Sequence, residues 1–440
     1  MALDSTALMV TSKAERNEKA AYKWMEDNMW LSADGKYAFQ PQTPLYSEDK
    51  FTKFVTALSK DTPGAEEEGH HSLDTPDKAE TQGLNQTTLD VADNMVKARG
   101  MQMIKTLSVI DGGNMLTGRR ADGRPYVLIG RDAILQTTLV NKHTYSDALI
   151  DEKLKTFDPD ASAVSRMIVM LKAGDFMSQT LTGEEANNQA IRFLAMNEIS
   201  QDIMADELNV PREDLVIISQ PGFHIDMYLR PLADGRVLMQ DDEETQKLVQ
   251  RVLNDESNKS VMRRRKYKTD LEKNLEKTLS DLAQSRQERE KVTALINKQL
   301  EDAGLQVIKT PGVFKVGYRQ VNYMNGIMGT SPTGEMFYLT NASSIEPLNQ
   351  AFSAWIQEKQ SGLNVHFVGL KDRFTESLLN GNGGFDCITL HHGTENLAQQ
   401  MAAFSEGRVS VSSTSGPTAE KTVVQLSSYN NSLDSSVRVA

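Results

Sequence analysis

The sequence predicts a mixed α/β fold, and three observations support this class. Short runs of β-branched and aromatic residues, such as Tyr126-Val127-Leu128-Ile129, follow glycine turns and are typical of strands. Between these runs lie segments with apolar residues at helical spacing, of which 185–208 is the clearest. A long charged segment, 243–303, contains no glycine or proline. Strands that alternate with helices in this way favour an α/β class.

The first hundred residues give weaker signals. Residues 13–29 carry good helix formers without glycine or proline and are predicted to form a helix. Asp34-Gly35 separates two short aromatic-rich pieces, which favours a hairpin. Residues 58–95 are polar and are expected to form a mobile surface loop. A strand is predicted at 107–110, before a Gly-Gly turn.

The remaining elements alternate along the chain. The further predicted strands and helices cover residues 126–129, 185–208, 215–218, 236–239, 307–308, 314–316, 336–339, 345–359, 364–368 and 388–390. The segment 243–303 has two partial apolar stripes separated by polar residues 283–291, which predicts an insertion of two or more amphipathic helices. We therefore expect one domain over residues 1–405 and a low-complexity tail over 406–440.

Composition excludes several classes of protein. The 440-residue chain has a formal net charge of -12, which argues against a binder of nucleic acid or of anionic membranes. No apolar run approaches the length of a membrane span, and the N-terminus lacks the pattern of a standard secretory signal. The single cysteine cannot form an internal disulfide, which suits a reducing compartment. The protein is expected in the cytoplasm, or exported without a standard signal peptide.

Cys387 is the candidate nucleophile. It is the only cysteine, it follows a Gly383-Gly384 turn, and an apolar run comes after it. A thiol at the start of a strand is held rigidly and can face a cleft, although buried cysteines are more often inert. A nucleophilic cysteine needs a histidine and carboxylates nearby in the fold.

Four other residues are candidates for that site. His224 and Asp226 stand two positions apart, so on a strand both side chains would point to one face. Asp111 opens a Gly-Gly turn, and Asp27 lies between two tryptophans. An ordinary turn residue and a helix cap are the alternatives for these two aspartates.

Together these side chains suit chemistry on a planar cation. Carboxylates bind a guanidinium through paired hydrogen bonds, and a thiolate can attack its central carbon. A histidine can protonate the departing amine and then activate water. The sequence contains no metal-ligand spacing, phosphate-binding loop, serine-triad motif or dinucleotide fingerprint, so neither a metal nor another cofactor is expected.

Four motifs carry a resemblance to the guanidine-modifying superfamily, which has the pentein fold. They are Trp24-Met25-Glu26-Asp27, Asp111-Gly112-Gly113-Asn114, Phe223-His224-Ile225-Asp226 and Gly383-Gly384-Phe385-Asp386-Cys387. Over roughly residues 20–395 the chain looks most like the catalytic domain of protein-arginine deiminases. The resemblance implies a pentein-type α/β propeller of ββαβ repeats with a helical insertion.

The resemblance also implies roles for the five residues. Cys387 would be the nucleophile and His224 the general acid/base, while Asp27 and Asp226 would grip the guanidinium. Asp111 would be a further substrate-binding residue that orients His224. Animal protein-arginine deiminases carry an acidic calcium ligand at the position of Trp30, which argues against calcium activation here.

The implied reaction is deimination of protein-bound arginine to citrulline and ammonia, through a covalent thiouronium on Cys387. The implied partner is an arginine-containing protein or peptide. One alternative is a deiminase or amidinotransferase that acts on a small guanidino compound such as free arginine or agmatine. Another is a catalytically weak, effector-like binding module that uses the 243–303 helices to hold a protein partner.

Overall fold

The structure is a computed structural model that describes most of the chain between residues 100 and 369. The described residues are 7–9, 29–31, 36–42, 48–58, 96, 100–220, 222, 224–232, 234–258, 271–330, 335–369, 378–379, 384, 386 and 389–391. Asp27 and Cys387 lie outside them. The predicted helix before Met29, nearly all of the 58–95 loop and the 406–440 tail also lie outside the described residues.

Four three-stranded sheets in the described part share one connectivity. In each, two strands pair antiparallel, and a third strand pairs parallel to the second after a helical crossover. A parallel pair requires such a crossover, usually an α-helix. The strands are β2 (Trp30–Leu31), β3 (Tyr37–Gln40) and β4 (Gln102–Lys105); β5 (Met115–Arg119), β6 (Pro125–Gly130) and β7 (Leu215–Ile218); β8 (Leu229–Pro231), β9 (Arg236–Gln240) and β10 (Gln306–Thr310); β13 (Gly326–Thr330), β14 (Met336–Asn341) and β15 (Leu363–Val368). The predicted ββαβ repeat is therefore present, with a hairpin between β2 and β3.

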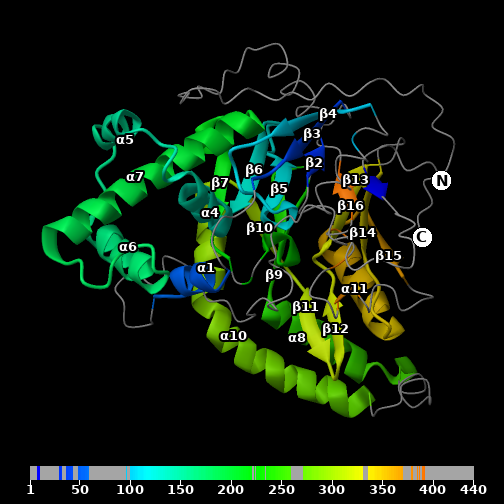
Figure 1. Ribbon diagram of the computed structural model, residues 1–440. Helices are drawn as coiled ribbons and strands as arrows, with labels where there is room; N and C mark the ends of the chain where they lie inside the picture. The colour runs from blue at the N-terminus through cyan, green and yellow to red at the C-terminus, as the bar shows by residue number, and fades with distance from the viewer. Residues whose placement is uncertain are drawn as a thin grey trace, which may run out of the picture.

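The crossovers differ in size. The first unit contains α1 (Glu48–Val55), and the fourth contains α11 (Glu346–Lys359). The second holds four described helices, which lie on the left of Figure 1: α4 (Arg131–Asn141), α5 (Asp147–Leu154), α6 (Ala161–Ala173) and α7 (Gly183–Leu208). The third holds α8 (Asp242–Asn254) and α10 (Leu271–Asp302). The charged segment 243–303 is thus the β9–β10 connection, and its polar stretch 283–291 does not interrupt α10.

Neighbouring units touch one another. β5 contacts β8, β8 contacts β13, and the first two units share a hydrophobic cluster that includes Trp30 and Ile129. The remaining described strands are the hairpin β11 (Val313–Val316) and β12 (Arg319–Asn322), and the antiparallel pair β1 (Ala7–Met9) and β16 (Thr389–His391), of which β16 contacts β2. The mixed α/β class is confirmed by these pairings, and closure into a propeller stays a prediction.

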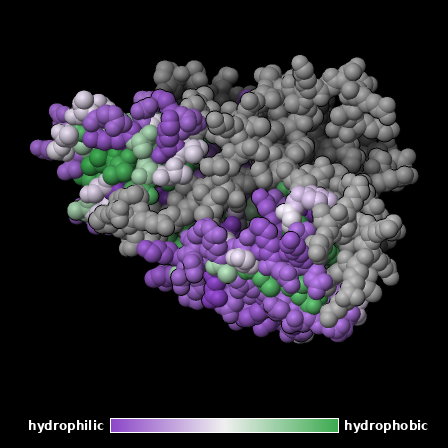
Figure 2. Space-filling model, turned by 90° about the horizontal axis from the view of Figure 1, so that it is seen from below, coloured by the Kyte–Doolittle hydropathy of each residue, from purple (hydrophilic) through white to green (hydrophobic). Residues whose placement is uncertain are grey.

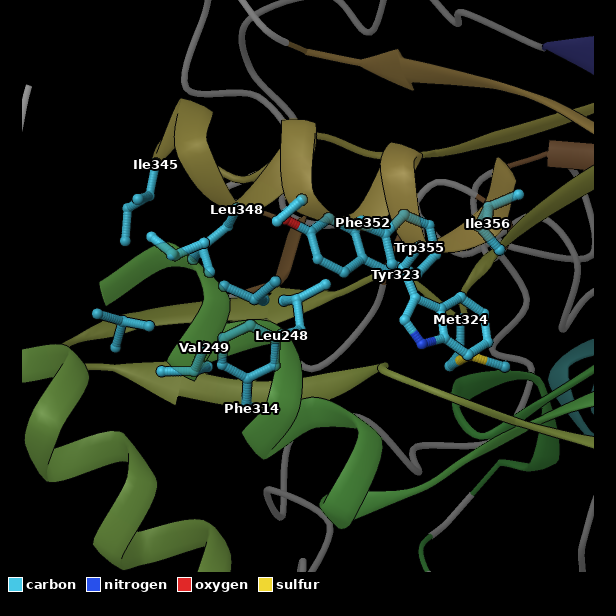
Figure 3. Packing of buried hydrophobic residues seen from close by; sticks show 14 of the residues in the cluster. Leu248, Val249, Phe314, Tyr323, Met324, Ile345, Leu348, Phe352, Trp355 and Ile356 are labelled. Carbon is cyan, nitrogen blue, oxygen red and sulfur yellow. The ribbon is translucent and has the colours of Figure 1, made fainter. Parts of the chain in front are cut away.

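Among the described residues, the largest hydrophobic cluster lies in the fourth unit and the helices beside it. Leu348, Phe352 and Trp355 form one face of α11 at helical spacing and point toward α8 (Figure 3). The ring of Tyr323 stacks on the ring of Phe352, with the two ring centroids 4.3 Å apart. Met324, the next residue, is also fully buried in this cluster. This core fixes the chain just before residue 325.

The strand predicted at 107–110 is wrong, because the strand of this region is β4 and ends at Lys105. Side chains from the second unit bind the backbone of residues 107–110 in place of a neighbouring strand. Glu207 accepts from the amides of Leu107 and Ser108, and Thr137 accepts from the amide of Val109. An apolar sequence pattern reports burial but does not show which groups satisfy the backbone.

On the face seen from below, the described residues are mainly hydrophilic, with small hydrophobic areas (Figure 2). Exposed pairs one helical turn apart, such as Lys277 and Asp281 at 2.7 Å, are typical of the solvent side of α10. None of the described helices is both long enough and apolar enough to cross a membrane.

Candidate functional site

Two short 3-10 turns form the centre of the candidate site. The first, η1 (Gly112–Asn114), begins after Asp111, and the second, η3 (Ile225–Met227), begins after His224. The two turns contact each other, although more than a hundred residues separate them in the sequence. Each turn directly precedes an outer strand of its unit, β5 or β8.

The strand geometry predicted for His224 and Asp226 is wrong. His224 has an extended backbone, but the chain then turns at η3, where the amide of Tyr228 bonds the carbonyl of Ile225 at 3.0 Å. A 3-10 turn does not place residues two apart on one face, because its period is about three residues. The common direction of the two side chains therefore has another cause.

Both side chains approach Gly113, where the absence of a Cβ atom leaves room for them. A Cβ atom at Gly113 would lie 2.3 Å from Nδ1 of His224 and 3.1 Å from Oδ1 of Asp226. Both side chains thus approach the backbone of η1 at the point where it has no side chain of its own. The Gly-Gly motif serves close approach of the two turns, and any larger residue at Gly113 would displace His224.

Asp111 lies at the open side of this arrangement. Its Oδ2 is 3.8 Å from Nε2 of His224, within ion-pair range when the imidazole is protonated. The Asp111 side chain is 40% exposed, whereas that of His224 is 9% exposed. Imidazole is a common acid/base group in proteins, and the Asp111 carboxylate is a partner for His224 when the ring is protonated.

Asn114 anchors η1 to the second unit. Its Oδ1 accepts from Nε2 of Gln220 at 3.0 Å, and Gln220 in turn accepts from the amide of Asp132 at 2.7 Å. A Cβ at Gly130 would lie 2.5 Å from Oδ1 of Asn114, so this network also depends on a glycine. The result is a buried link from η1 to the start of α4.

A second buried network connects Asp226 to Asp386, the residue before Cys387. Nδ2 of Asn325 donates to Oδ2 of Asp226, and Oδ1 of Asn325 accepts from the amide of Asp386 at 2.9 Å. The carboxylate of Asp386 forms an ion pair with Arg230 on β8. Asp226, Asn325 and Asp386 are all fully buried. Buried charges are stable when they are paired and hydrogen-bonded, and the Asp386 carboxylate has both kinds of contact from Arg230.

Arg230 stays cationic in this interior. Burial alone would lower the pKa of Arg230, but the neighbouring Asp386, Tyr338 and Asp226 raise that pKa above its usual value. The guanidinium therefore supplies positive charge to a region that contains two buried carboxylates. Removal of Arg230 would leave both of them without it.

Of the five predicted site residues, the structure brings together Asp111, His224 and Asp226. Asp27 and Cys387 lie outside the described residues, as does Phe385. Gly384 is described: a Cβ there would lie 2.2 Å from Oδ1 of Asn325. The second glycine of the cysteine motif therefore has a packing role.

Metal and cofactor binding were expected to be absent. Among the described residues, no group of three or more histidine, cysteine, aspartate or glutamate side chains is placed to hold a metal ion, and the expectation stays a prediction. Trp30 is 7% exposed and stacks on Phe39 with ring centroids 5.8 Å apart. That residue is part of the hydrophobic core.

The sequence prediction missed Arg230, Asn325 and Asp386. Two signals were available: Arg230 interrupts an apolar stretch after the His-x-Asp motif, and Asp386 directly precedes Cys387. A charged residue inside a buried run usually has an opposite charge as its partner, but the sequence does not name that partner.

Comparisons with known proteins gave only remote structural likenesses. No family model matches the sequence. No curated protein matches it either. A substrate-bound agmatine deiminase from C. jejuni is 9% identical, with a TM-score of 0.37 over 84% of this chain and 73% of that one. A second agmatine deiminase structure from C. jejuni is 12% identical, with a TM-score of 0.31 over 70% of this chain and 64% of the other. Neither likeness establishes a shared fold, so the repeat architecture rests on the strand pairings.

Proposed function

We propose that this protein hydrolyses a guanidinium group by way of a thiouronium on Cys387. One observation carries the proposal: Asn325 joins Asp226, which meets His224 at Gly113, to the amide of Asp386. Cys387 is the next residue after Asp386 in the chain, and consecutive Cα atoms are only about 3.8 Å apart. This chain position supports a thiol close to the acid/base and the carboxylate.

The reaction divides into two steps that balance. The Cys387 thiolate forms a bond to the central guanidinium carbon, and the C–N bond to one terminal nitrogen breaks as that nitrogen takes a proton from His224 and leaves as ammonia. Neutral His224 then removes a proton from water, whose oxygen attacks the thiouronium carbon. The thiolate leaves, and the proton that remains on the oxygen passes to solvent. Overall, water replaces ammonia and the guanidino group becomes a ureido group.

The carboxylates have separate roles in this proposal. Asp226 and Asp27 bind the guanidinium nitrogens, where charge-assisted hydrogen bonds also orient the carbon for attack. Asp111 faces Nε2 of His224 and favours the imidazolium that donates to the leaving nitrogen. Burial of Asp226 strengthens its attraction for a cation, because little water screens it.

Two substrate classes stay in the proposal. Protein-bound arginine is the first expectation from the sequence, and a small guanidino compound is its alternative. The described residues do not distinguish them. Agmatine, the compound named in both compared structures, is the first substrate in the assay below, ahead of free arginine and peptidyl arginine.

The test measures release of ammonia and formation of the ureido group from each compound. We expect turnover of at least one of them by the wild-type chain, and none by Cys387→Ala. Mass spectrometry of the wild-type protein, quenched during turnover, should show an adduct on Cys387. Full activity of Cys387→Ala would exclude covalent catalysis, and no turnover of any guanidino compound would exclude deimination.

The binding-module alternative concerns α8 and α10. Their inner faces are part of the protein core, through residues such as Leu248 and Leu282, while charged side chains cover the solvent side of α10. A partner would therefore bind the outer face. Absence of turnover combined with stable capture of one partner, lost on charge reversal at Lys277 and Asp281, would favour this alternative.

A further inference from the structure

Asn325 contacts two segments that the proposed reaction must hold together. Its side chain donates to Asp226 in η3 and accepts from the backbone of Asp386. Asp226 is a proposed guanidinium-binding residue, and Asp386 directly precedes Cys387. One fully buried amide thus spans the distance between a binding carboxylate and the segment that carries the nucleophile.

We propose that Asn325 is a positioning residue, which sets the placement of Asp386, the residue before Cys387, relative to Asp226. The inference deepens the proposed function and rests on it for its catalytic meaning. Asn325 itself exchanges no proton and forms no covalent bond in the reaction. Its effect comes from geometry, because small displacements of reacting groups cost large factors in rate.

The backbone around Asn325 is held on every side. Its amide donates to Oδ1 of Asn322 at 3.1 Å, and its carbonyl accepts from Nδ2 of Asn341 at 2.6 Å. The two preceding residues, Tyr323 and Met324, are buried in the core of the fourth unit (Figure 3). A side chain on such a backbone has little freedom, so its two hydrogen bonds transmit position.

The two partners of Asn325 also fix which way its amide faces. The backbone nitrogen of Asp386 can only donate, so it must face the oxygen Oδ1. Nδ2 then faces Asp226, whose ionised carboxylate can only accept. No other uncharged side chain of this length offers one donor and one acceptor in opposite directions, apart from a protonated aspartic acid.

Two further features hold the Asp386 side of this link. A Cβ at Gly384 would collide with Oδ1 of Asn325, so the glycine allows the chain to approach the amide. The ion pair between Arg230 and Asp386 holds the same residue from β8. Two units of the fold, the third through Arg230 and the fourth through Asn325, therefore hold the residue before Cys387.

The first experiment compares Asn325→Ala with Asn349→Ala. Asn349 is a buried asparagine of the same unit that binds the hydroxyl of Tyr323 and the backbone of Ser343, and it contacts neither Asp226 nor Asp386 in the described bonds. Asn325→Ala should lower kcat by at least about tenfold. It should also change the rate at which iodoacetamide alkylates Cys387, which is readable because the chain has no other cysteine. Asn349→Ala should lower stability only.

The second experiment uses Asn325→Asp, which has nearly the same shape. Burial and the carboxylates of Asp226 and Asp386 raise the pKa of the new carboxyl, whereas Arg230, and His224 when protonated, oppose that rise. We expect the first group to dominate, so that the carboxyl holds its proton to a higher pH than a free carboxyl. While protonated, it donates to Asp226 as the amide does. The ratio of its kcat to that of the wild type should therefore fall as pH rises. Once ionised, it should slow alkylation of Cys387 at least about threefold, because a negative charge disfavours the thiolate.

Several results would overturn the inference. A folded Asn325→Ala variant with the kcat and the alkylation rate of the wild type would do so. Asn349→Ala would also do so if it changed kcat and the alkylation rate as much as Asn325→Ala does. If Asn325→Ala does not fold, a pH-independent activity ratio for Asn325→Asp is the contrary result. If the wild type turns over no guanidino compound, the proposed function fails by itself. In that case the alkylation rates alone test the role of Asn325. An alkylation rate of Cys387 that is unchanged in Asn325→Asp would show that Asn325 does not position Cys387.

Discussion

Glu207 and Asp386 are two buried carboxylates that perform a similar structural task with different partners. Glu207, at the end of α7, accepts from the amides of Leu107 and Ser108 and from the Ser108 hydroxyl. It thereby holds the chain that leads to Asp111. Asp386 holds the chain that leads to Cys387, and its carboxylate is paired with Arg230.

The difference lies in the charge of the partners. Burial raises the pKa of Glu207 to about 7. Its three hydrogen bonds, from the Ser108 hydroxyl and from the amides of Leu107 and Ser108, lower that pKa, and Asp206 raises it. Asp386 instead faces a guanidinium, which favours its ionised form. A buried carboxyl with neutral donors, such as Glu207, thus changes its protonation with pH. A buried carboxyl with a cationic partner, such as Asp386, stays charged, but its stability depends on that cation.

The largest effect is expected from Arg230→Met. It removes the cation and leaves Asp386 charged, buried and unbalanced, which should lower the free energy of unfolding by about 3–5 kcal/mol. Urea denaturation at neutral pH measures the loss. The double variant Arg230→Met/Asp386→Asn should recover part of it, because no unbalanced charge remains. Arg251→Ala, which breaks an exposed pair with Glu358, should leave the unfolding midpoint nearly unchanged.

A loss no greater than that of Arg251→Ala would contradict this contrast. It would mean that the charge of Asp386 does not depend on Arg230 in the folded protein.

The second prediction concerns the pH dependence of Glu207. Its pKa is raised from the model-peptide value of 4.5 to about 7 in the folded state, so between these pH values the folded protein keeps a proton that the unfolded chain releases. Stability from this group is therefore fully present below pH 4.5 and is lost as pH rises through about 7. Relative to Glu207→Gln, the wild type should lose on the order of 3 kcal/mol over that window.

Urea denaturation of both proteins between pH 5 and 8 measures this difference, with Tyr145 as a nearby group to account for. Burial raises the pKa of Tyr145 to about 12, and Glu207 contributes to the rise, so the tyrosine does not titrate in this range. A constant difference between wild type and Glu207→Gln across the window would refute a raised pKa for Glu207.

The smallest effect is expected from Ser108→Ala. The substitution removes one hydrogen bond and should lower the free energy of unfolding by about 1 kcal/mol. Because the Ser108 hydroxyl lowers the pKa of Glu207, its loss should also move the Glu207 transition to higher pH. Carboxyl carbon chemical shifts of Glu207 against pH report that movement. A shift toward lower pH would show that the hydroxyl does not favour the ionised form.

The sequence by itself determined the elements with strong local patterns. The strands near 126–129, 215–218 and 236–239 and the helices near 185–208 and 345–359 are present, because periodic burial leaves a periodic trace in the chain. It also identified Asp111, His224 and Asp226, which the fold places together. Local turn and motif chemistry was sufficient for these.

The tertiary structure alone decided how these elements hold the candidate site. It replaced a predicted strand at 107–110 by bonds to Glu207, 99 residues away for Ser108. It paired Arg230 with Asp386 across 156 residues, and Asn325 with Asp226 across 99 residues. Such contacts arise only when separate units pack against each other. A single polar residue has no periodicity, so nothing in its sequence neighbourhood identifies the distant group that satisfies it.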